Sequence, residues 1–232
     1  MELQIWKMLT LVVSSLIATS APADTLFTIA ESSGDQVKMS RLWVDHGRYR
    51  LESTVGDEHG LEIFNDGKLY LLNSREKTYT VLDRERLARD AAVHREWIER
   101  SSSTEQTASR RELRQTEGVK LTGTQACRVW EVLVNNELQQ EICVLPLKAL
   151  KTGIIVRKTM DRYNELLAEF DASTPSMPWS DVETTEGIPI SVVTYARGKV
   201  HSSSVTVSIN TAEVAAPKRY ELPPGMREVL LK

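Results

Sequence analysis

Apolar and polar residues alternate in short runs along the first third of the chain, and turn-forming residues separate the runs. A period of two is typical of β-strands with one buried face. The runs predict six strands, at Leu26–Glu31, Val37–Val44, Arg48–Ser53, Leu61–Asn65, Lys68–Asn73 and Thr78–Leu82. Asp66-Gly67, between the fourth and fifth runs, is the strongest two-residue hairpin signal. The pattern therefore predicts a six-stranded antiparallel meander.

Two later segments change to the spacing of a helix. Asp83 is an N-cap candidate, and the apolar positions after it predict a helix that ends near Arg100. The second segment carries one apolar stripe, formed by Met160, Tyr163, Leu167 and Phe170. This stripe fits a helix packed on a sheet or a lid over a ligand cavity. Both interpretations require it to face the concave side of the sheet.

The rest of the chain predicts more strands and two long connections. The polar stretch Ser101–Gln115 predicts a mobile surface connection, and Asp171–Gly187 predicts another. Strands are expected at Val119–Thr122, before the cysteine-containing segment, and at Ile188–Ala196 and Val200–Ile209 after it. The tail Tyr220–Met226 is expected to be extended and to end in a turn. No repeat marks a second domain, so residues 24–232 are expected to form one mainly β domain of the α+β class.

Residues 1–23 have the features of a secretory signal peptide. Lys7 precedes an apolar run, residues 8–18, that is too short to span a bilayer, and Ala21-Pro22-Ala23 supplies small residues for cleavage. We expect cleavage before Asp24 and a periplasmic mature protein. An N-terminal anchor that stays attached is the alternative.

Cys127 and Cys143 are expected to pair in that oxidising compartment. They lie in two strand-like runs around a turn signal, Asn135-Asn136. If the residue numbers of each opposing pair in this hairpin sum to 270, Cys127 lies opposite Cys143. The two strands are then joined by a three-residue loop, Val134–Asn136. A disulfide there closes a loop of about 15 residues and stabilises the fold by roughly 3 kcal/mol. The alternatives are two unpaired thiols, if the register slips, or a redox pair, although the Cys-x-x-Cys spacing typical of redox pairs is missing.

Charge and candidate chemistry narrow the function. The formal net charge of −3 is near balance and creates no long-range field for nucleic acid. His46 and His59 lie in turn-like segments beside acidic residues and would bind a metal only if the two turns met in space. His201 precedes Ser202–Ser204, but no nucleophile elbow is present. The sequence predicts no catalytic residue, metal ligand or cofactor, so an enzyme is not expected.

Four stretches resemble a known family: LWVDHGRYRLES, LEIFNDGKLYLLNSREKTYTVLD, LTGTQACRVWEVLV and YELPPGM. In this order they look like a broad family of uncharacterised exported bacterial proteins, similar in plan to the periplasmic lipoprotein carrier LolA and its relatives. The resemblance implies a strongly curved antiparallel sheet, or incomplete β-barrel, covered by helices. It also implies an apolar cavity for acyl chains or a lipidated partner. Cys143 departs from the family pattern, which has a tryptophan near this place.

Two functions are compatible with these features. The first is an envelope binding protein that holds a lipid, a lipoprotein acyl chain or another apolar ligand in the concave sheet. The second is a periplasmic protein-interaction or sensor module with a filled core, whose partner is an envelope protein. For the first, the expected ligand-lining residues are Trp43, Leu51, Ile63, Leu69, Leu71, Val81, Trp130, Met160, Tyr163, Leu167 and Phe170.

Overall fold

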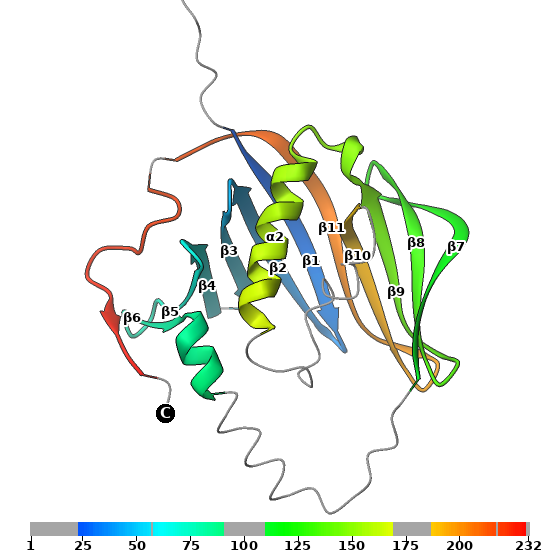
Figure 1. Cartoon of the computed structure of the whole chain (residues 1–232), viewed down its shortest axis with the longest axis horizontal. Helices are drawn as coiled ribbons and strands as arrows, with labels where there is room; N and C mark the ends of the chain where they lie inside the picture. The colour runs from blue at the N-terminus through cyan, green and yellow to red at the C-terminus, as the bar shows by residue number, and fades with distance from the viewer. Residues whose placement is uncertain (1–22, 57, 91–109, 169–186, 217, 231–232) are drawn as a thin grey trace, which may run out of the picture.

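The structure is a computed structural model that describes residues 23–56, 58–90, 110–168, 187–216 and 218–230. The strands of these residues form a single curved sheet in the order β12-β6-β5-β4-β3-β2-β1-β11-β10-β9-β8-β7 (Figure 1). Their bounds are β1 Ala23–Ser33, β2 Gln36–Asp45, β3 Arg48–Val55, β4 Glu58–Asn65, β5 Lys68–Asn73, β6 Thr78–Leu82, β7 Arg111–Thr122, β8 Gln125–Val134, β9 Glu137–Pro146, β10 Gly187–Ala196, β11 Lys199–Val214 and β12 Arg227–Glu228.

The six-stranded meander predicted from the alternation is confirmed, because β1 to β6 are neighbours in chain order and pair antiparallel. Asp66 and Gly67 join β4 to β5 with φ values of 52° and 71°. Two consecutive positive φ angles define the tight hairpin turn whose twist matches that of the strands. The Asp-Gly signal was therefore correct.

The second half of the chain continues the sheet from β1. Strand β11 pairs with β1, so the first strand lies in the middle of the sheet. Strand β7 begins at Arg111, and residues 111–115 pair with β8, so the expected mobile connection is wrong for those residues. Leu113, opposite Val132, packs against a buried cluster on β8, β9 and β10, which explains the pairing of so polar a stretch. The remainder of that connection, 101–109, lies outside the described residues.

Both predicted helical segments are confirmed over the residues that the structure describes, whereas 91–100 of the first and Phe170 of the second lie outside these residues. Residues 84–90 are helical, and Asp83 Oδ1 accepts a hydrogen bond of 2.9 Å from the Arg86 backbone N–H, as expected of an N-cap. Helix α2, Gly153–Leu167, follows a short 3₁₀ turn, η1, Leu147–Ala149. It lies across one face of the sheet and contacts β2 and β10 (Figure 1). None of the helices among the described residues has the length and apolar composition needed to cross a bilayer.

Side chains fill the space between α2 and the meander. The ring of Tyr163 on α2 packs edge-on against Tyr49 and Phe64, with centroids 5.3 and 5.8 Å apart. The buried cluster around these rings also includes Phe27, Leu42, Val44, Leu69, Leu87, Val156, Met160 and Leu166. This part of the concave face therefore holds a packed helix–sheet core.

The Cys127–Cys143 disulfide is present, with Cα atoms 5.5 Å apart, but the expected register of its hairpin is wrong. Cys143 lies directly opposite Val129, so the bridge crosses the strands diagonally. Asn135 and Asn136, with φ values of 51° and 66°, form a two-residue turn in place of the expected three-residue loop. A register shift between Val132 and Leu133 changes the pairing along the hairpin, and alternation alone does not reveal such an irregularity.

Candidate functional site

The predicted ligand-lining residues do not gather in one cavity. Six of them belong to the packed core under α2 or border it: Leu51, Leu69, Leu71, Met160, Tyr163 and Leu167. Trp43, Ile63 and Val81 lie on the opposite face of the meander, in register with Arg50 and Tyr70. Trp130 packs against a separate cluster, and Phe170 lies outside the described residues. A single concave lining made of all these residues is therefore wrong.

Both faces of the meander are apolar because each is covered. Helix α2 covers one face, and part of the chain after β11 lies against the other. Tyr220 in this C-terminal segment is buried, and the backbone oxygen of Arg219 accepts a hydrogen bond of 3.0 Å from Arg50 Nη1. The apolar residues at the two alternating sets of positions therefore pack in two interfaces, one with α2 and one with the C-terminal segment. The prediction had assumed that each strand buries only one face.

Trp130 lies on the α2 face but away from the part of the sheet that α2 covers. Residues directly opposite each other on neighbouring strands share a face. One such row crosses the sheet through Lys38, Glu31, Ser204, Val192, Ile142 and Trp130. Glu31 alternates in β1 with Ile29 and Phe27, which belong to the α2 core. The indole therefore projects from the same concave surface, several strands away from the meander.

A pocket of about 590 Å³ opens beside α2 at this place. Strands β8 and β9, turn η1 and the first half of α2 form its walls. The residues that line it are Arg128, Trp130, Val144, Pro146, Leu147, Lys148 and Arg157. We call this the basic pocket, because three of these described lining residues are cationic and none is acidic.

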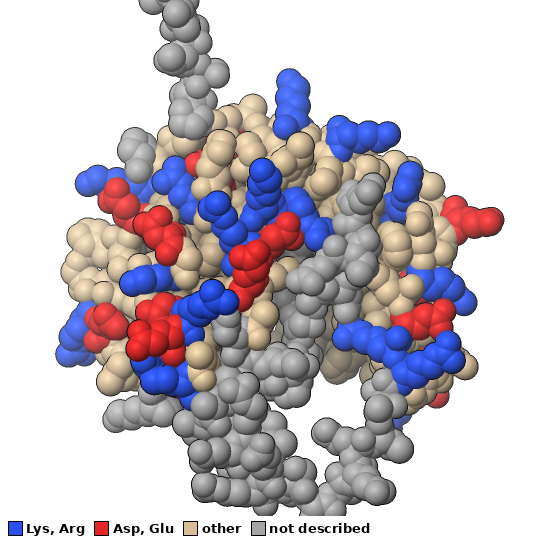
Figure 2. All heavy atoms as spheres, in the orientation of Figure 1, with Lys and Arg blue, Asp and Glu red and all other residues tan. Residues whose placement is uncertain are grey.

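The cations of the basic pocket differ in how firmly they are held. Arg157 Nε donates to Asp161 Oδ1 at 2.7 Å, and its Nη1 donates to the Gly187 backbone oxygen at 3.2 Å. These bonds fix that guanidinium beside the start of β10. Arg128 and Lys148 are exposed and extend toward solvent. Figure 2 shows Lys and Arg side chains predominating on this face around the start of α2.

The composition of the pocket defines what it can bind. Its volume lies within the range of about 300–1,000 Å³ typical of small-molecule sites. Trp130, Val144, Pro146 and Leu147 offer an apolar wall, and the cationic groups offer only hydrogen-bond donors. A ligand with an apolar part and an anionic head satisfies both.

The core beneath α2 also contains a polar contact that was not predicted from the sequence. The Tyr49 hydroxyl donates a hydrogen bond to Glu62 Oε1 on the neighbouring strand. Burial raises the pKa of Glu62 above its ordinary value, although the Tyr49 bond and Lys38 oppose the shift. Burial and the Glu62 charge likewise raise the pKa of Tyr49 and of Tyr163. The Tyr49–Glu62 hydrogen bond therefore joins β3 to β4 beneath the ring of Tyr163.

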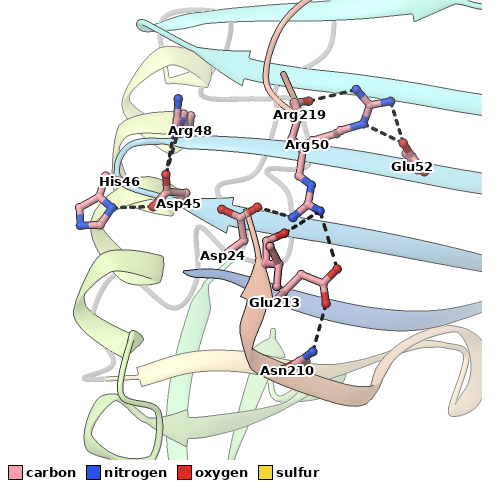
Figure 3. A network of polar contacts seen from close by, with 10 residues as sticks. Asp24, Asp45, His46, Arg48, Arg50, Glu52, Asn210, Glu213 and Arg219 are labelled. Carbon is pink, nitrogen blue, oxygen red and sulfur yellow. Dashed lines mark hydrogen bonds and ion pairs between the residues drawn. The ribbon is translucent and has the colours of Figure 1, made fainter. Parts of the chain in front are cut away.

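The two turn histidines do not meet. His46 precedes β3 and its Nδ1 lies 2.5 Å from Asp45 Oδ1, whereas His59 contacts the hydroxyl of Thr54 at the other end of β3. Burial raises the pKa of Asp45, but hydrogen bonds from Arg48 and His46 outweigh it, so that the pKa lies below its ordinary value (Figure 3). Among the described residues, no group of three His, Cys, Asp or Glu side chains is arranged to hold a metal ion.

The architecture defines a class, a large curved and mainly antiparallel sheet with a helix packed on one face. No protein-family model matches the sequence, and no curated protein matches it. An uncharacterised conserved protein from Thermus thermophilus is similar in structure, with a TM-score of 0.51, 9% sequence identity and 90% of each chain covered. At this identity the similarity concerns the fold alone.

Two further solved structures are more distant. MucB gives a TM-score of 0.44 at 13% identity, with 90% of this chain and 60% of that chain covered. The MucA/MucB complex of Pseudomonas aeruginosa gives 0.45 at 11% identity, with 91% and 60% covered. The chain thus spans about 60% of the length of these MucB chains.

Trp130 was predicted from the sequence as a lining residue, but the cations around it were not. Arg128 stands two residues before Trp130 on one strand, and this spacing places both on the same face. That signal was available. Lys148 and Arg157 reach the pocket only because η1 follows β9 directly and α2 packs against η1 and β10, which no local pattern reports.

Proposed function

We propose that this protein is a non-catalytic binding module of the bacterial envelope, exported to the periplasm, whose basic pocket holds an anionic amphiphile. The ligand class is an acyl chain, or a similar apolar group, with a negatively charged head. The observation that carries the proposal is the pairing of an apolar wall around Trp130 with cations from three different elements. Carboxylate or phosphate heads form charge-assisted hydrogen bonds with such groups.

Three further observations support the proposal. The disulfide fits an oxidising compartment, as the signal-like residues 1–23 predict. The LolA-like plan that the sequence resembles is that of carriers of acylated molecules. The space under α2 is occupied by Tyr49, Phe64 and Tyr163, so the ligand belongs beside the helix.

Native mass spectrometry of the protein isolated gently from its own envelope tests the proposal. We expect a mass excess that fragments to an acyl lipid, or uptake of oleate or phosphatidylglycerol offered to the bare protein. Charge reversal by Arg128→Glu with Lys148→Glu should reduce uptake at least tenfold. The matched control, Lys68→Glu with Lys199→Glu, changes the net charge equally at exposed positions away from the pocket.

Two results would overturn the proposal. One is bare protein that takes up neither lipid. The other is equal loss of uptake in the pocket variant and in the control variant, because a general electrostatic effect would then explain the binding.

A further inference from the structure

A second groove lies on the face of the sheet opposite α2. It measures about 620 Å³ and runs between the meander and the C-terminal segment. Its lining residues are Arg41 and Trp43 of β2, Arg50 and Glu52 of β3, and Ala216, Lys218 and Arg219 after β11. We call it the rear groove.

The walls of the rear groove are fixed to each other. Arg50 Nη1 donates to the backbone oxygen of Arg219, and Arg50 Nε donates to Glu52 Oε1 at 2.7 Å. Arg219 in turn binds the carboxylate of buried Asp24, and its Nη2 lies 3.7 Å from Glu213 (Figure 3). The groove is therefore held open by its own contacts. Among the described lining residues, Glu52 is the acidic one, and its charge is already neutralised by Arg50.

The remaining polar side chains among the described lining residues of the rear groove are all hydrogen-bond donors. Arg41 and Lys218 are exposed, stand on opposite walls and have no ion-pair partner among the described residues. The Arg219 guanidinium lies 5.1 Å from the ring centre of Trp43, which is 8% exposed. Within the described part of the chain, the Trp43 Nε1–H has no hydrogen-bond acceptor. A buried donor without an acceptor costs about 1–3 kcal/mol, so an acceptor supplied from outside is favoured.

We propose that the rear groove binds an extended, acidic segment of a partner polypeptide. Carboxylates along such a segment pair with Arg41 on the sheet wall and with Lys218 on the C-terminal wall. Its backbone or side-chain oxygens supply the acceptor that Trp43 lacks. A single inorganic anion fits less well, because the groove of about 620 Å³ carries a cation on each of its two walls. One small anion would also leave the cation on the other wall unpaired.

The site is independent of the proposed lipid pocket. The two lie on opposite faces and share none of their lining residues. Because the two sites lie on opposite faces, a ligand in one does not block the other. Failure of lipid binding would therefore leave the rear groove untouched.

Fluorescence anisotropy with a fluorescein-labelled peptide of ten glutamates tests the inference. The probe for comparison is the same peptide with ten glutamines. Because the protein itself carries a formal net charge of −3, general attraction of polyglutamate is not expected, and binding must come from a local basic site. We expect the glutamate peptide to bind at least tenfold more tightly than the glutamine peptide, with affinity falling as salt rises.

Variants locate the binding. Arg41→Glu with Lys218→Glu should weaken it at least tenfold, Trp43→Phe should weaken it severalfold with unchanged circular dichroism, and the control Lys68→Glu with Lys199→Glu should change it less than twofold. Equal weakening by both double variants would overturn the proposal. Displacement of the peptide by inorganic phosphate at equal charge concentration would also overturn it and would identify a site for small anions.

Discussion

Arg219 binds the carboxylate of Asp24, although the two residues are 195 positions apart in the sequence. Asp24 is the second residue of β1 and has none of its surface exposed, and Arg219 lies in the C-terminal segment behind the sheet (Figure 3). The pair joins the two ends of the folded chain. It also makes the C-terminal segment an integral part of the fold.

Loss of this pair should be costly. Arg219→Ala leaves a buried carboxylate without its cation, and breaking a buried ion pair costs about 3–5 kcal/mol. We expect a loss of that size in the free energy of unfolding measured with urea. Arg89→Ala, which removes an exposed pair with Glu85, is the control and should cost less than about 0.5 kcal/mol. Similar small losses in both variants would show that Asp24 does not depend on Arg219.

Glu62 should make stability depend on pH in the opposite sense from an ordinary ion-paired carboxylate. Its pKa in the folded protein is raised above 4.5, so the protonated form is favoured by folding. The associated stability is present below the unfolded pKa and is lost as pH rises through the folded pKa. Glu62→Gln keeps an acceptor for Tyr49 and removes the charge.

We therefore expect Glu62→Gln to have a higher free energy of unfolding than the wild type at pH 7. The difference should shrink as pH falls toward 4.5 and below it. Urea unfolding at a series of pH values measures this. A difference that stays constant with pH would mean that the Glu62 charge is not the cause.

The backbone plan was more predictable from the sequence than the contacts between elements. Short apolar runs separated by turn residues, with Asp66-Gly67 as the strongest signal, predicted the meander, because a tight turn joins each strand to its neighbour. Strand β12 escaped prediction, since two residues, Arg227 and Glu228, carry no periodicity. Their pairing with β6 depends on how the C-terminal segment runs, which is a tertiary property.

The disulfide should contribute measurably to stability. It closes a loop with a sequence separation of 16, for which the chain-entropy estimate is about 3 kcal/mol. Cys127→Ser with Cys143→Ser should lower the free energy of unfolding by about that amount. Labelling of the denatured, unreduced protein should find no reactive thiol. Two labelled thiols in protein from the periplasm would contradict the bridge.

The candidate site depends on two properties that the sequence did not reveal: the face that each apolar residue occupies, and the contacts between separate elements. Apolar residues of the meander are buried on both of its faces, and the sequence did not show which of them face α2. Ile63 and Leu71 stand on adjacent strands and face opposite ways, one away from α2 and one toward it. The basic pocket combines four separate elements, and only their folding brings Arg128, Lys148 and Arg157 together.

Ile63 and the pocket cations should therefore affect different properties. Ile63 is fully buried on the face away from α2, so Ile63→Ala should cost about 2–5 kcal/mol in unfolding free energy and leave lipid uptake by the folded fraction unchanged. Arg128→Glu with Lys148→Glu changes exposed side chains, so it should alter stability by about 0.5 kcal/mol per site or less and abolish most of the uptake. Urea unfolding and native mass spectrometry of the same samples measure both quantities. Loss of uptake in folded Ile63→Ala protein would instead place the ligand against the opposite face of the sheet.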